Sequence, residues 1–137
     1  MDNDILKEFI SESSELLDKC RVALENFNSS GDAKYFEEFG LYIDRIMGTA
    51  ATIDLKELAE ISCLGKELGY KGSQVEQIDR LLALSGLMSQ IIAYVEKSLK
   101  RFKKKKFEPP ENFETLKEKL KLASQHLGDL RGTVKIE

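Results

Sequence analysis

Apolar side chains recur at steps of three and four residues along nearly the whole chain, and this spacing is typical of amphipathic helices. Short stretches rich in glycine, serine, asparagine or proline divide the pattern into five segments, with almost no strand signal. The first segment has apolar positions from Leu6 to Phe27, and the others cover about 33–52, 54–72, 73–102 and 111–131. We therefore expect five helices.

Residues at two segment boundaries predict how the helices begin. Asp54, with Glu57 three positions later, is expected to cap the third helix. The sequence Ser73–Glu76 has the spacing of a capping box and is expected to open the fourth. The apolar face of that fourth helix is expected to include Ile78, Leu81, Leu82 and Met88.

The length and composition predict one domain. A chain of 137 residues, of which 42% are hydrophobic and 33% charged, can bury a core of its own. Four long segments with short connections predict an all-α fold, an up-down-up-down four-helix bundle with an additional C-terminal helix. We expect the domain to span residues 1–131, with residues 132–137 as a tail that frays.

Charge and cysteine content narrow the function classes. A formal net charge of -3 argues against nucleic-acid binding, which normally shows as a strongly basic domain. Cys20 and Cys63 lie in helical patterns without a nearby metal-ligand motif, so we expect buried thiols in a reducing compartment. We found no signal peptide and no apolar run of the length that spans a membrane, so the expected location is the cytoplasm.

The second predicted helix carries an unusual set of small residues. Its core-facing positions, at helical spacing, are Phe36, Phe39, Ile43, Ile46 and Ala50. The neighbouring stripe of the same helix consists of Gly40, Asp44, Met47, Gly48 and Ala51. Because glycine inside a helix costs about 1 kcal/mol relative to alanine, two glycines on one stripe indicate a close approach. The approaching group is either a partner protein or a neighbouring helix of the same chain.

This helix resembles the signature of histidine-containing phosphotransfer (HPt) domains, in which His-x-Ile/Leu-Lys-Gly-x-Ala/Ser is followed by small residues. When Gly48 and Ala50 are aligned with the motif, Ile46 occupies the aliphatic position. Asp44 then stands where the phosphorylated histidine should be, and Met47 replaces the lysine. The resemblance to the chemotaxis-kinase type of HPt domain continues upstream in Phe9–Asp18, similar to Phe-x-x-Glu-x-x-Glu-Leu-Leu, and downstream in Leu55–Ile61.

The resemblance implies an HPt-like bundle that has lost its phosphate acceptor. Such a protein would bind a response-regulator receiver domain or a histidine kinase without transferring phosphate, as an adaptor or an inhibitor. It would need no cofactor and no metal, and it would not be an enzyme. The expected partner-binding residues are Asp44, Arg45, Met47, Gly48, Ala51, Cys63 and Lys66, with Cys63 near the position of a polar partner of the missing histidine.

Two other interpretations stay open at this point. The small-residue stripe could be the seam of a homodimer in a structural or oligomerisation module, and active phosphotransfer would require His126 or an unexpected product on Asp44. His126 lacks the motif context and is expected on the solvated side of the fifth helix. The basic run Lys97–Lys106 could dock an acidic partner, but lysines are also favoured at a helix C-terminus by the helix dipole.

Overall fold

The computed structural model describes the backbone of residues 2–136 and the side chains of residues 2–127. It contains five helices: α1 (Asn3–Ser30), α2 (Lys34–Thr52), α3 (Lys56–Gly72), α4 (Ile78–Lys103) and α5 (Phe113–Ile136). No strand occurs in this described part of the chain, so the predicted all-α class is confirmed. The segment 132–137, expected as a tail, is helical as far as Ile136.

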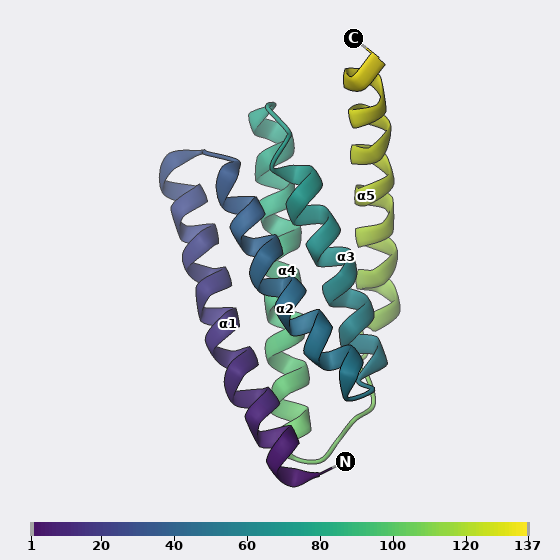
Figure 1. The fold of residues 1–137 in the computed structure, drawn as a ribbon. Helices are drawn as coiled ribbons and strands as arrows, with labels where there is room; N and C mark the ends of the chain where they lie inside the picture. The colour runs from purple at the N-terminus through teal and green to yellow at the C-terminus, as the bar shows by residue number, and fades with distance from the viewer. Residues whose placement is uncertain (1, 137) are drawn as a thin grey trace.

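The first four helices surround one core and run in alternating directions (Figure 1). α2 packs against α1 and α3, and α4 also packs against α1 and α3. Among the described residues no Cα atom of α2 lies within 8 Å of one of α4, so these two helices occupy opposite corners of the bundle. α5 packs mainly on the outside of α3 and touches α4 only slightly.

The core of the second helix agrees with the sequence pattern. All five expected positions are fully buried, namely Phe36, Phe39, Ile43, Ile46 and Ala50. Phe36 also lies against Phe27 of α1, with ring centroids 4.4 Å apart. The apolar face of α2 is therefore fixed by its contacts with α1 and α3, and the neighbouring stripe is turned toward the outside or toward α3.

The predicted apolar face of α4 is wrong at two positions near its start. Ile78 and Leu82 are 53% and 57% exposed, whereas Leu81 and Met88 are buried as expected. Residues 81–84 are all apolar, so the local spacing does not show which of the adjacent Leu81 and Leu82 faces the core. Packing against α1 and α3 selects the face that enters the core.

Both predicted helix caps are also wrong. α3 begins after Leu55, which makes no side-chain cap hydrogen bond, and Asp54 has a left-handed backbone with φ 66°. Leu55 is buried, and its N–H donates to the Ala50 carbonyl at 2.9 Å, so the tight reversal between α2 and α3 uses Asp54 as its left-handed residue. At the next turn, the Ser73 hydroxyl donates to the Tyr70 carbonyl at 2.7 Å, and α4 starts only at Ile78.

α4 also bears on the expected absence of a membrane span. By length and composition alone, α4 is the one helix among the described residues that could cross a bilayer. Its buried residues, among them Leu81, Met88, Ile91 and Val95, form part of the shared core, and core helices of soluble proteins pass the same test. Less than half of its most apolar stretch is buried inside the protein. Its outer side is thus unusually poor in charge.

Candidate functional site

Five of the predicted partner-binding residues share the outer side of α2, and we call them the α2 face: Asp44, Arg45, Met47, Gly48 and Ala51. Arg45, Gly48 and Ala51 are exposed, while Asp44 and Met47 are half-buried. Two threonines of this stretch bond back to the preceding turn of the helix: the Thr49 and Thr52 hydroxyls donate to the carbonyls of Arg45 and Gly48. The α2 face therefore offers a regular helical surface with little side-chain bulk at its centre.

The two glycines on the stripe have different structural roles. A Cβ atom at Gly40 would lie 2.8 Å from Cε1 of Tyr70 on α3, so this glycine permits close packing within the protein. At Gly48, no atom lies within 4 Å of the Cβ position, so this glycine faces open space. Tight internal packing therefore explains Gly40 but not Gly48.

A cross-helix ion pair ties the α2 face to α3. The Nζ atom of Lys66 lies 3.4 Å from Oδ1 of Asp44, the residue that aligns with the acceptor of the HPt motif. The side chains are 27% and 42% exposed, so solvent screens the pair and its contribution to folding is at most about 1 kcal/mol. The pair nevertheless places a cation, the Lys66 ammonium, beside residue 44, where the HPt motif has its lysine at the position of Met47.

Tyr70 is a neighbour of the site that the sequence reasoning missed. Its ring covers Gly40, one turn after Lys66 on α3. Partial burial raises the pKa of the Tyr70 phenol, and the Asp44 carboxylate raises it further while Lys66 lowers it. In the sequence, the only indication of this contact is a glycine on one helix and a tyrosine on the next. The two cannot be paired without knowing which faces of the helices meet.

The two cysteines should differ strongly in reactivity, although we had expected both to be buried. Cys20 is fully buried, and this burial raises its thiol pKa to about 12, whereas Cys63 is a half-buried free thiol on α3. Only a thiolate is alkylated efficiently, and a pKa near 12 leaves about one Cys20 in 10⁴ ionised at pH 8. We expect iodoacetamide at pH 8 to label Cys63 at least about 100-fold faster than Cys20, as measured by peptide mass spectrometry. Equal labelling in the folded protein would contradict the assigned burial, and equal labelling in urea is the control.

Other candidate chemistry lies away from the α2 face. His126 is exposed, as predicted, and its Nε2 lies 2.9 Å from Nη1 of Arg80. No three histidine, cysteine or acidic side chains come together among the described residues. A shallow groove of about 210 Å³ between α1 and α2 is lined by Val22, Tyr42 and charged residues, and Lys19 stacks over Tyr42 at 5.8 Å.

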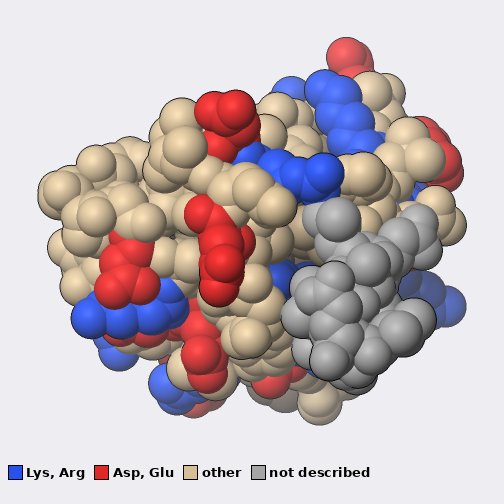
Figure 2. All heavy atoms as spheres, turned by 90° about the horizontal axis from the view of Figure 1, so that it is seen from above, with Lys and Arg blue, Asp and Glu red and all other residues tan. Residues whose placement is uncertain are grey.

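The basic run lies at the end of the molecule where α4 meets the link to α5, close to the N-terminus (Figure 1). Lys105 contacts the Asn3 side chain, and Arg101 donates to the Glu108 carbonyl at 3.2 Å. The opposite end of the molecule carries positive and negative side chains side by side (Figure 2). The run is thus partly engaged in contacts that hold the α4–α5 link.

No protein family, curated protein or solved structure matches the chain. The five residues of the α2 face include no hydroxyl, thiol or imidazole nucleophile, and they combine apolar and charged groups on a partly exposed surface.

Proposed function

We propose that the protein is an HPt-like interaction module of two-component signalling that cannot be phosphorylated. It would bind a receiver domain or a histidine kinase and act as an adaptor or an inhibitor. In this proposal α1–α4 correspond to the up-down-up-down HPt bundle, and α5 is the additional helix. The fit of the helix order and the motif position on α2 supports the proposal, and the open surface at Gly48 carries it.

The open glycine supports partner docking because the fold itself does not require it. An alanine at residue 48 would meet no neighbour and would favour the helix by about 1 kcal/mol. Gly48 therefore leaves an open stretch of helix backbone on the α2 face, where a partner can approach closely. Met47 beside it adds an adaptable apolar contact of the kind that interface centres favour.

The substitutions at the acceptor position support binding without transfer. A carboxylate at residue 44 lacks the neutral nitrogen that accepts a phosphoryl group in an HPt domain. In this protein the carboxylate also forms an ion pair with Lys66, which lies on the neighbouring helix α3. The pair would present a neutralised, hydrogen-bonding surface to the acidic pocket of a receiver domain, where an unpaired carboxylate would be repelled.

Binding can be tested with an arginine at the open glycine. We expect Gly48→Arg to weaken binding of a cognate receiver domain, purified from the same organism, by at least about tenfold. Isothermal titration of the monomeric receiver measures this without avidity. The matched control is Gly86→Arg on α4, since Gly86 is also helical and also has no atom within 4 Å of its Cβ position.

The same pair of variants separates the proposal from its alternative, a homodimer joined through the α2 face. If receiver domains and kinases do not bind but Gly48→Arg converts a dimer to a monomer, the α2 face is an oligomerisation seam. If neither variant changes receiver binding but Lys103→Glu/Lys104→Glu abolishes it, the interface lies in the basic run at the end of α4.

A further inference from the structure

The outer face of α4 has the composition of a contact surface, and it is exposed among the side chains that the structure describes. Six of its exposed positions form one straight stripe at alternating steps of four and three, which we call the α4 seam: Asp79, Ala83, Gly86, Gln90, Ala93 and Lys97. Leu82 borders the stripe and is 57% exposed. From residue 81 to 95 no charged residue occurs, so this solvent-facing side lacks the charges typical of an exposed helix face.

The residues of the α4 seam are arranged symmetrically about the middle of the helix. Their positions pair as 79 with 97, 83 with 93 and 86 with 90, and every pair is centred on residue 88. An acidic residue ends the seam on one side and a basic residue on the other. We propose that two copies of the chain associate through this seam, with their α4 helices antiparallel and related by a twofold axis that passes between Gly86 and Gln90.

Charge complementarity selects this occupant and this orientation. In the antiparallel pair, Asp79 of each copy lies opposite Lys97 of the other, so the twofold axis creates the same ion pair twice. A parallel pair would instead place aspartate against aspartate and lysine against lysine. The centre of the seam contains only small or uncharged residues, so the two helices can approach closely without burying a charge.

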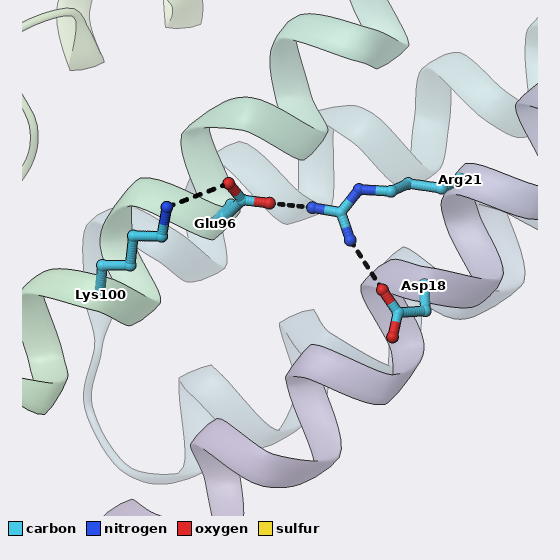
Figure 3. A network of polar contacts seen from close by, with 4 residues as sticks. All are labelled: Asp18, Arg21, Glu96 and Lys100. Carbon is cyan, nitrogen blue, oxygen red and sulfur yellow. Dashed lines mark hydrogen bonds and ion pairs between the residues drawn. The ribbon is translucent and has the colours of Figure 1, made fainter.

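The side chains that this pairing uses are available. Neither Asp79 nor Lys97 forms an ion pair with any side chain that the structure describes. The neighbouring charges on α4 are engaged differently: Glu96 accepts from Arg21 of α1 and pairs with Lys100, as Figure 3 shows. This network anchors α4 to α1 beside the seam and leaves Lys97 outside it.

The α4 seam is independent of the proposed receiver-binding function. α2 and α4 occupy opposite corners of the bundle, so pairing through α4 leaves the α2 face uncovered in both copies. A dimer would therefore present two α2 faces and could bind a dimeric partner with both. The association itself requires no such partner.

Sedimentation equilibrium of the purified full chain from about 5 to 500 µM, at low salt, tests the proposal. We expect a reversible dimer whose dissociation constant rises at least about tenfold in Gly86→Arg and stays unchanged in Gly48→Arg. Asp79→Lys and Lys97→Asp should each weaken the dimer about fivefold or more, and the double variant Asp79→Lys/Lys97→Asp should restore it. This reciprocal rescue does not depend on how well Gly86→Arg folds.

A wild-type protein that remains monomeric over this range would overturn the proposal. If that monomer also floats with phosphatidylcholine/phosphatidylglycerol vesicles, the occupant of the α4 face is lipid and not a second copy of the chain. A dimer that Gly48→Arg dissociates while Gly86→Arg does not would move the contact to the α2 face. A dimer that both single charge variants weaken without rescue in the double variant would reject the antiparallel register. None of these results depends on binding of a receiver domain.

Discussion

Replacing Gly69 by alanine should destabilise the protein by about 2–3 kcal/mol, despite the higher helix propensity of alanine. A Cβ atom at residue 69 would lie 2.7 Å from the Phe36 carbonyl oxygen and 3.0 Å from the Cα and N atoms of Gly40. These are backbone atoms of α2, so no side-chain rotation can relieve the clash and the two helices must separate. Urea unfolding followed by circular dichroism measures the change.

The matched controls are the same substitution at the two open helical glycines. Gly48→Ala and Gly86→Ala meet no atom within 4 Å, and we expect each to raise the free energy of unfolding by about 0.5–1 kcal/mol. A stabilised Gly69→Ala variant would show that α2 and α3 do not cross at this point. The position of the α2 face relative to Lys66 would then have to be revised.

The wild-type protein should acquire no phosphate from a phosphorylated cognate receiver, whereas the double variant Asp44→His/Met47→Lys should become labelled. Residue 44 is partly exposed on α2, so an imidazole there can reach a partner's active site. Such a histidine titrates near pH 6.5 and is largely neutral and nucleophilic at pH 7.5. The lysine introduced at residue 47 lies one turn away on the helix, and Lys66 of α3 already lies beside residue 44.

Radiolabel transfer followed by tryptic mapping to the peptide that contains residue 44 detects the product, which should be acid-labile and base-stable. Asp44→His alone should be labelled more slowly, because only Lys66 then supports the phosphoryl group. Asp44→Asn/Met47→Lys is the matched control, with the lysine but without the nucleophile, and should stay unlabelled.

A folded double variant that binds the receiver but never acquires label would show that the likeness to HPt domains does not extend to the site geometry. Wild-type label that disappears in His126→Ala would instead indicate an active phosphotransferase.

The sequence determined the helices and most of the core. Steps of three and four residues place Phe36, Ile43 and Ile46 on one face of any helix formed by this segment, and that face must be buried in a chain of this length. The spacing also placed Asp44 and Gly48 near each other, since residues four apart are neighbours on a helix surface. These results follow from local geometry and need no knowledge of the other helices.

Tertiary structure alone decided what faces each stripe. Gly40 and Gly48 have the same local setting, but α3 crosses α2 at the first and leaves the second open, because Tyr70 and Gly69 lie opposite Gly40. The partner of Asp44 proved to be Lys66, a contact between helices that no spacing within one helix encodes. At the start of α4, where residues 81–84 are all apolar, the spacing admitted both Leu81 and Leu82, and only packing against α1 and α3 left Leu82 on the exposed side. Periodicity specifies which residues share a face, whereas the surroundings of that face depend on segments distant in sequence.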